Sequence, residues 1–402
     1  MSQKRILIIS SNFTGHGHKS ISESLAEQLS LQSDVMLHVV DGFSLIGQAG
    51  IRASKLYGPL TRNAQDIWKL SYNLTSRESG KAVEDVLTAL VYDRFMRCIT
   101  QFQPGLIVTV HALFTRSLLN ILEYHRIDIP FVVLQADIIN IHPAWCDRRA
   151  SLTFCPTQEA YECSRNVHHM PEKKLELCGF PTRERFIHAA KQPDIIAPYD
   201  GTRPLRCLLM SGGEGSGNLM KYARQLLEHV DCTLSIVCGR NKKLKQAFDE
   251  QLQPLYPGRI EAHGFLENVQ DHMKSADLVI ARGSPNTMLE AIVMGVPLMI
   301  TGSLPGQESD NPALVVTHNL GVVCGNPESA PALVKALMNC GGKRLTEIRE
   351  AQRNYRNFDS AKNLAARLYE LARENDSHDA RPMRRFPITL VHSRYGHTKP
   401  KR

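Results

Sequence analysis

The chain has 402 residues, of which 43% are hydrophobic, 22% are charged and 6% are aromatic. This composition is typical of a globular protein and excludes disordered, collagen-like and disulfide-scaffold chains, while the length predicts two domains. The formal net charge is +8, but residues 381–402 hold seven Lys and Arg residues and no acidic residue, so the rest of the chain is nearly neutral.

The ends of the chain and its cysteines bear on where the protein acts. No apolar run reaches the ~18 residues of a membrane-spanning helix, and the first residues lead directly into a short apolar run without a signal or transit segment. The ten cysteines contain no C-x-x-C pair, which indicates reduced, mostly buried thiols rather than a zinc site. We therefore expect a cytoplasmic protein.

The first half of the chain has the order of a parallel α/β sheet. Residues 4–10 are an apolar run bounded by small residues and predict a buried strand, followed by a loop over 11–18 and a helix over 20–31. Further strands are predicted at 37–40, 106–109, 131–134 and 152–155. Between them, residues 46–72 mix apolar and aromatic residues with Lys and Arg. They form either a segment that lies in a membrane interface or an ordinary helix pair that covers the sheet.

The same pattern recurs after residues 191–204, which are rich in Pro, Asp, Gly and Ala and predict a linker. Strands are predicted at 205–210, 233–238, 278–281 and 297–301, and helices at 218–230, 269–276 and 285–294. Two such units predict two Rossmann-like domains that face a cleft. We assign an N-terminal domain (1–190), the linker (191–204), a C-terminal domain (205–355), a helix that crosses back (356–378) and a basic tail (379–402).

Two loops of the second unit can bind phosphate. The loop 211–217 reads Ser-Gly-Gly-Glu-Gly-Ser-Gly between a strand and a helix, where backbone N–H groups and the helix N-terminus favour an anion, although a plain tight turn is the alternative. Residues 282–287 repeat this arrangement, with Pro285 suited to the first helical position and Ser284 to the cap. Glu290 lies in the same helix and either binds ribose hydroxyls or only complements the helix dipole.

The loop of the first unit carries histidines in place of a phosphate-binding pattern. A histidine above the end of a strand suits a general base, and His18 is the candidate. His16 and His18 as half of a metal site, or as exposed capping residues, are the alternatives.

A second group of candidates follows the strand predicted at 131–134. Asp137 lies just beyond the carboxyl end of this strand, where α/β folds place ligand contacts. His142 and Trp145 follow in the segment His-Pro-Ala-Trp and have either a binding or a structural role. The sequence suggests that Asp137 orients His18.

These segments together resemble a family. Residues 16–18, 137–145, 155–158, 178–181, 211–215, 239–243, 263–265, 282–287 and 305–308 are similar, in the same order, to blocks of the monogalactosyldiacylglycerol synthases and the bacterial processive diacylglycerol glucosyltransferases (glycosyltransferase family 28). The similarity spans roughly residues 5–325. A more distant one extends to the lipid-linked N-acetylglucosaminyl transferase of peptidoglycan synthesis.

The resemblance implies a GT-B fold and an inverting, metal-independent transfer of galactose or glucose from a UDP-sugar to diacylglycerol, without a cofactor. It implies that His18 is the base, that Phe265 lies by the uracil and that Gln307 and Glu308 bind the sugar. The remaining implied donor-binding residues are Gly212, Gly213, Glu214, Gly215, Arg240, Arg282, Ser284, Asn286, Thr287 and Glu290, and the acceptor-binding residues are Gly17, His142 and Trp145.

The same reading implies the partners. We expect UDP-hexose, diacylglycerol and anionic membrane lipids, no nucleic acid, and a peripheral position on the inner face of the cell membrane. Two alternatives stay open: a glycosyltransferase with a soluble or another lipid-linked acceptor, and a binding protein with an inactive site whose basic tail contacts nucleic acid.

Overall fold

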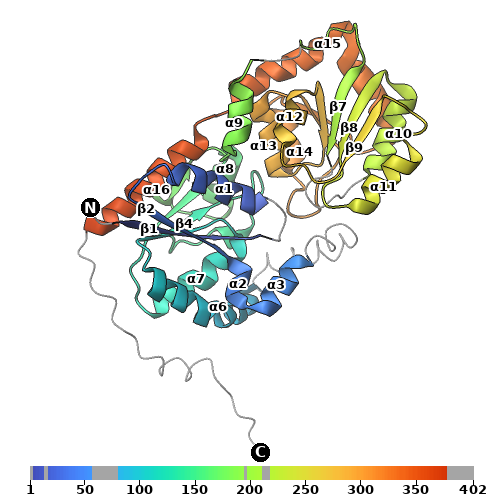
Figure 1. The fold of residues 1–402 in the computed structure, drawn as a ribbon. Helices are drawn as coiled ribbons and strands as arrows, with labels where there is room; N and C mark the ends of the chain where they lie inside the picture. The colour runs from blue at the N-terminus through green and yellow to red at the C-terminus, as the bar shows by residue number, and fades with distance from the viewer. Residues whose placement is uncertain (1–2, 13–16, 57–79, 194–196, 211–217, 378–402) are drawn as a thin grey trace, which may run out of the picture.

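The computed structural model describes residues 3–12, 17–56, 80–193, 197–210 and 218–377 of the chain (Figure 1). The strands form two separate six-stranded sheets, with the orders β2-β1-β3-β4-β5-β6 and β12-β11-β10-β7-β8-β9. All neighbouring strands are parallel. This confirms the predicted α/β class with two Rossmann-like domains.

The first sheet is built from residues before the linker. Its strands are β1 (Lys4–Ser10), β2 (Val35–Asp41), β3 (Leu106–Thr109), β4 (Phe131–Leu134), β5 (Leu152–Cys155) and β6 (Leu175–Leu177). The helices of this half are α1 (Gly17–Leu29), α2 (Gly42–Ile46), α3 (Gln48–Lys55), α6 (Gly80–Phe102), α7 (Ala112–Tyr124), α8 (Gln158–Glu162) and α9 (Glu184–Lys191), with short turns at η1 (Pro143–Trp145), η2 (Cys163–Val167) and η3 (Glu172–Lys174).

The second sheet follows the linker. Its strands are β7 (Leu205–Met210), β8 (Cys232–Val237), β9 (Ile260–His263), β10 (Leu278–Ala281), β11 (Leu298–Ile300) and β12 (Gly321–Val323). The remaining helices are α10 (Leu219–His229), α11 (Lys242–Gln251), α12 (Val269–Lys274), α13 (Pro285–Met294), α14 (Asn311–Thr317), η4 (Pro327–Ser329), α15 (Ala330–Tyr355) and α16 (Ser360–Ser377). Helix α15 is interrupted at residues 339–342, where three consecutive residues have positive φ.

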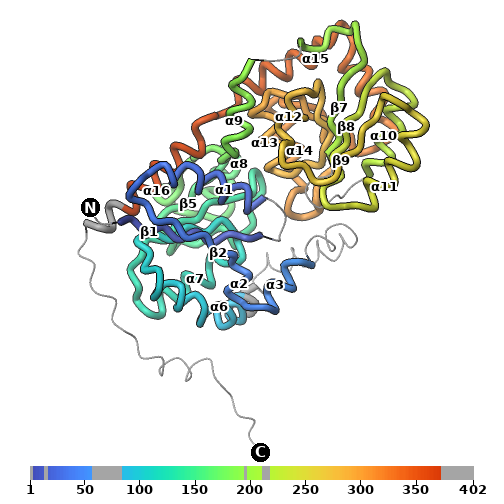
Figure 2. Tube along the Cα trace, in the orientation of Figure 1, coloured from blue at the N-terminus to red at the C-terminus, as the bar shows by residue number. Residues whose placement is uncertain are grey.

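Helices cover both faces of each sheet. In the first domain α1 and α16 lie on one side and α2, α6 and α7 on the other, so β1 is enclosed and its residues from Ile6 to Ile9 have no exposed surface (Figure 1). An uninterrupted apolar run is what a parallel strand with two covered faces requires. Helix α16 returns from the second domain and packs against α1 and β1 (Figure 2), where the Tyr369 hydroxyl donates to Asp34 at 2.8 Å.

The two domains share an apolar contact. Helix α9 packs against α12 and α13, and its Phe186 and Ala189 belong to the same buried cluster as Met273 and Leu289 of the second domain. Lys274 of α12 also donates to the carbonyls of Ala189 and Gln192 at the end of α9. The described part of the chain therefore holds the domains together through side-chain packing as well as through the linker.

Some predicted boundaries differ from the structure. Helix α1 begins three residues earlier than predicted and ends at Leu29, because the chain turns there through a bond from Gln32 N to the Leu29 carbonyl and leaves Leu31 exposed. Strand β2 is longer than predicted, because it is an edge strand with several exposed residues and has no continuous apolar run. Of the stretch 46–72, residues 48–55 form helix α3 and residues 57–72 lie outside the described residues.

The length and hydropathy of a helix decide whether it can span a membrane. Within the described ranges, none of the helices combines the length and the apolar character that a bilayer crossing requires.

The end of the linker is fixed by a buried carboxylate. Asp277, at the start of β10, has no exposed surface and accepts hydrogen bonds from the guanidinium groups of Arg203 and Arg206 at 2.6–3.1 Å. Burial alone would raise the pKa of Asp277, but these hydrogen bonds lower it to about 2. The ionised pair therefore contributes stability at neutral pH, and that contribution is lost as the pH falls from about 4 to about 2.

We predict that Asp277→Asn lowers the free energy of unfolding by about 3 kcal/mol, because it leaves two arginines without their buried partner. Urea denaturation followed by circular dichroism measures the change. Asp249→Asn breaks a more exposed pair with Lys245 and serves as the control, with an expected change below about 0.5 kcal/mol. Equal losses in the two variants would contradict this account.

Candidate active site

The carboxyl ends of the two sheets meet where helices α1 and α13 begin. Helix α1 follows β1 and helix α13 follows β10, and a Cβ atom added to Gly17 would lie 3.0 Å from the Asn286 side-chain nitrogen. The first turns of two helices, one from each domain, therefore approach each other. Both carry partial positive charge, so this boundary favours an anion.

His18 lies in the first turn of α1 and is buried. Its Nδ1 is 2.6 Å from the carbonyl oxygen of Val110, which can only accept, so Nδ1 carries the proton and Nε2 keeps its lone pair. Burial lowers the pKa of His18 to about 4, although the bond to Val110 opposes this shift. The ring is therefore a neutral imidazole at neutral pH, which is the form that a general base needs.

A second histidine, which the sequence analysis did not identify, lies beside the first. The ring centroids of His111 and His18 are 4.4 Å apart, and His111 caps α7 by accepting from Leu113 N at 3.3 Å. Burial, and then the neighbouring His18, keep the pKa of His111 well below 6.5. Its position in the sequence could have identified it, because His111 follows the strand at 106–109 just as Asp137 follows its own strand.

Asp137 is buried and is held from both domains. Trp145 Nε1 donates to its Oδ2 at 2.6 Å, and Gln307 of the second domain donates to its Oδ1 at 3.4 Å. Burial raises the pKa of Asp137 to about 6, while these two hydrogen bonds oppose the shift. The expectation that Asp137 orients His18 is not what the structure shows, because the Val110 carbonyl orients the ring.

His142 and Trp145 have contacts of their own within the first domain. His142 caps η1 by accepting from Ala144 N at 3.1 Å, and Trp145 is almost completely buried, with its ring centroid 6.2 Å from that of His18. Trp145 thus joins Asp137 to the surroundings of His18. Binding of the acceptor by these two residues stays a prediction.

The second domain contributes an ion pair beside Asp137. Arg282 Nε lies 3.0 Å from Glu308 Oε2, and the same oxygen accepts from Leu304 N at 2.9 Å. Glu308 and the adjacent Gln307 therefore have fixed positions next to Asp137. The structure thus brings Asp137 of the first half of the chain together with Gln307 and its neighbour Glu308 of the second half.

Helix α13 begins with Ser284 as its cap and Pro285 in its first turn, as predicted. The Ser284 hydroxyl donates to Thr287 Oγ1 at 3.1 Å and makes no capping bond to the backbone. The first amides of α13 are consequently not capped by this side chain, which is the condition for anion binding at a helix N-terminus.

The remaining predicted donor-binding residues that the structure describes follow strands of the second sheet or lie in α13. The Arg240 guanidinium lies 5.4 Å from the centroid of the half-exposed Phe265 ring, after β8 and β9 respectively. Glu290 is buried in α13 and accepts hydrogen bonds from Arg183. Gly212, Gly213, Glu214, Gly215 and His16 lie outside the described residues.

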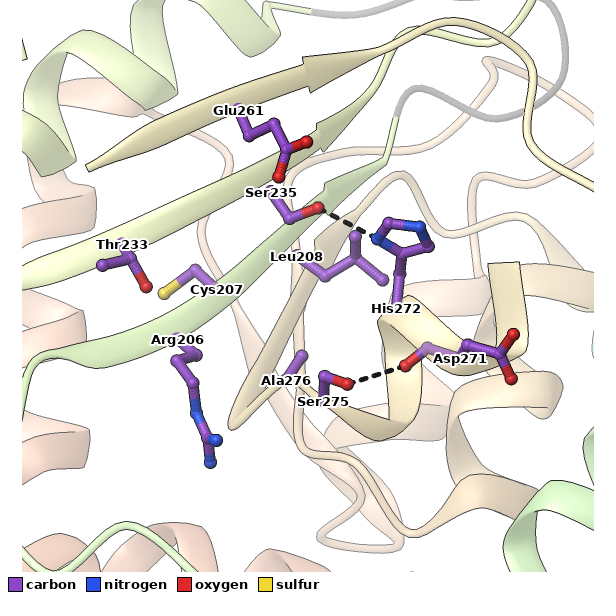
Figure 3. A pocket seen from close by; sticks show the side chains of 10 residues that line it. All are labelled: Arg206, Cys207, Leu208, Thr233, Ser235, Glu261, Asp271, His272, Ser275 and Ala276. Carbon is purple, nitrogen blue, oxygen red and sulfur yellow. Dashed lines mark hydrogen bonds between the residues drawn. The ribbon is translucent and has the colours of Figure 1, made fainter. Parts of the chain in front are cut away.

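A hollow of about 320 Å³ lies elsewhere on the second domain, over β7 and β8 beside α12 (Figure 3). His272 and Ser235 face each other across it at 3.4 Å, and Arg206 on its rim is bound to Asp277. All of its lining residues come from one domain, so it does not combine groups of both domains as the α1–α13 boundary does.

A metal site would require several ligating side chains close together. The described segments contain no group of three or more His, Cys, Asp or Glu side chains that could hold a metal ion.

Comparisons with known proteins identify what this chain is similar to. Residues 18–182 match the family model of monogalactosyldiacylglycerol synthase, and residues 213–340 match that of glycosyl transferases group 1. The chloroplastic monogalactosyldiacylglycerol synthase of Spinacia oleracea is 25% identical over 376 residues, which cover 88% of this chain and 69% of that protein. Synthase 2 of Arabidopsis thaliana is 25% identical over 347 residues, which cover 82% and 73%.

Solved structures share the fold at low identity. MurG of Acinetobacter baumannii has a TM-score of 0.57 and 16% identity, with 91% of this chain and 99% of that chain covered. The glycosyltransferase SnogD of Streptomyces nogalater has a TM-score of 0.55, 16% identity and coverages of 92% and 100%. The chain thus has a GT-B fold and is a glycosyltransferase related to the monogalactosyldiacylglycerol synthases.

The shifted pKa values predict a pH profile for the transfer. A raised carboxyl pKa means that Asp137 loses its charge as the pH falls through about 6, whereas His18 stays neutral down to about 4. If the reaction uses ionised Asp137, kcat/KM falls below pH 6 well before His18 is protonated.

Rates of the wild type and of Asp137→Asn between pH 4.5 and 8 test this expectation. The variant should be slower, and its residual rate should no longer decline near pH 6. A decline near pH 6 that persists in the variant would show that another group titrates there.

Proposed function

We propose that this glycosyltransferase moves a hexose, galactose or glucose, from a UDP-sugar to the hydroxyl group of diacylglycerol, with inversion and without a metal. The observation that carries the proposal is the neutral, buried His18 of the first domain beside the N-terminus of α13 in the second. A base on one domain and an anion-binding helix on the other suit a transfer between two substrates held by different domains.

The second domain supplies groups for the donor. The first turn of α13, together with Arg282 and Arg240, would stabilise the negative charge of the diphosphate as the bond to the sugar breaks. Phe265 would lie by the uracil, Glu290 would hold the ribose, and Gln307 and Glu308 would bind sugar hydroxyls. Relatives named as monogalactosyldiacylglycerol synthases support this assignment of a nucleotide sugar and a lipid acceptor.

The chemical step follows from these positions. The acceptor oxygen attacks the anomeric carbon on the face opposite the diphosphate, a new C–O bond forms and the bond to UDP breaks. Nε2 of His18 takes the hydroxyl proton, and UDP leaves with the bonding electron pair. Burial disfavours the resulting imidazolium, so the proton is released to solvent as the products leave.

The acceptor requires access to a membrane, and the first domain offers a suitable surface. Leu56 follows α3 and is exposed, as are Val86 and Leu90 four residues apart on α6, and Arg52 and Lys55 lie in the last turn of α3. Exposed apolar side chains beside basic ones are typical of proteins that bind at an anionic interface. We propose a cytoplasmic protein that is peripheral on the inner face of the cell membrane.

The first experiment is a product assay with diacylglycerol in mixed micelles that contain an anionic lipid, with UDP-glucose and UDP-galactose offered separately. A glycolipid from either donor supports the proposal and identifies the sugar. Turnover only with a soluble acceptor, and without any need for lipid, would favour a glycosyltransferase of different acceptor class. UDP binding without any transfer would favour a binding protein.

The role of His18 has its own test. We expect His18→Ala to lower kcat at least ~10²-fold while UDP still binds, because the base acts only in the transition state. His38→Ala, at an exposed histidine of the same domain, is the control and should keep the wild-type rate. Near-normal turnover of the His18 variant would remove this residue from the base role.

A further inference from the structure

An ion pair joins the first domain to the predicted ribose site. Arg183 precedes α9, and both its Nε, at 2.9 Å, and its Nη2 donate to Oε1 of Glu290 in α13. The side chains of Arg183 and Glu290 are 16% and 6% exposed. This pair is therefore shielded from solvent, where a charge-assisted contact holds its geometry most firmly.

The pairing uses only one oxygen of the carboxylate. Both donors of Arg183 go to Oε1, and Oε2 accepts no hydrogen bond from the residues that the structure describes. The guanidinium therefore fixes the direction of the carboxylate without occupying it completely. Oε2 is left to accept from a hydroxyl group of a ligand.

Arg183 is also connected to the helix that carries His18. The carbonyl of the preceding Thr182 accepts from Ser24 of α1 at 2.8 Å, and the following Glu184 accepts from Gln28 of α1 at 3.0 Å. The residues on either side of Arg183 are thus attached to α1, while its side chain holds α13. Arg183 lies at the point where the helix of the base and the helix of the ribose residue are joined.

We propose that Arg183 is a positioning residue that completes the ribose site from the opposite domain, by holding the Glu290 carboxylate aimed so that Oε2 accepts a ribose hydroxyl. This inference rests on the proposed UDP-sugar donor. It adds that recognition of the ribose depends on contact between the domains, so a donor domain separated from Arg183 discriminates poorly between ribose and deoxyribose.

The test compares two ligands that differ at the ribose. Calorimetry on the full chain gives Kd values for UDP and for 2′-deoxy-UDP in the wild type, in Arg183→Met and in Arg183→Lys. We expect the wild type to prefer UDP, and Arg183→Met to bind UDP at least ~10-fold more weakly with little change for 2′-deoxy-UDP. Arg183→Lys keeps the charge but not the two-nitrogen fork, so it should keep part of the preference.

The control is Lys274→Met, which removes another contact between α9 and the second domain but does not touch Glu290. It should keep the wild-type preference for UDP. If the melting temperature shows that Arg183→Met does not fold, Arg183→Lys takes its place. It is then judged by the ratio of its Kd values for UDP and 2′-deoxy-UDP.

Two outcomes overturn the inference in distinguishable ways. A wild type that prefers UDP, with the same preference in the Arg183 variants, overturns the role of Arg183 and leaves the donor assignment intact. A wild type that does not bind UDP overturns the proposed donor, and the inference with it.

Discussion

The position of helix α1 is the constraint on which the rest of the site depends. The hydroxyl of Ser22 donates to the His18 carbonyl at 2.9 Å and lies 2.6 Å from the Ser10 hydroxyl, which attaches the first turn of α1 to the end of β1. Further along, Ser24 attaches the helix to the segment that precedes α9. A helix fixed at both places gives the His18 ring one position within the first domain, and a base must have such a position.

Three titratable groups whose pKa values are shifted by burial lie where the two domains meet. His18 and His111 are neutral for the same reason that Asp137 holds its proton more tightly, namely that charge is poorly stabilised away from water. Groups shifted in this way are uncommon in a core without function, and their clustering where the two domains meet is a physical argument for chemistry there.

The sequence predicted the parts of this molecule that local pattern determines. The strands at 4–10, 205–210 and 278–281 contain short apolar runs, and α13 begins at Pro285 and ends at Met294 as predicted, so these elements were found with correct limits. Strands β6, β9 and β12 are short edge or near-edge strands without such a run. The Val110 carbonyl and Arg183 act through contacts between residues 92 and 107 positions apart, which no local pattern contains.

The apolar contact between α9 and α13 has a mechanical consequence. Because Phe186 and Leu289 share one buried cluster, separating the domains at that place would expose apolar surface to water, while the polar contacts between Asp137 and Gln307 exchange readily with water. A rotation that admits substrates would therefore pivot about α9 and α13. The edge with His18 and Asp137 would open like the free side of a hinge, with Glu290, the proposed ribose residue, near the axis.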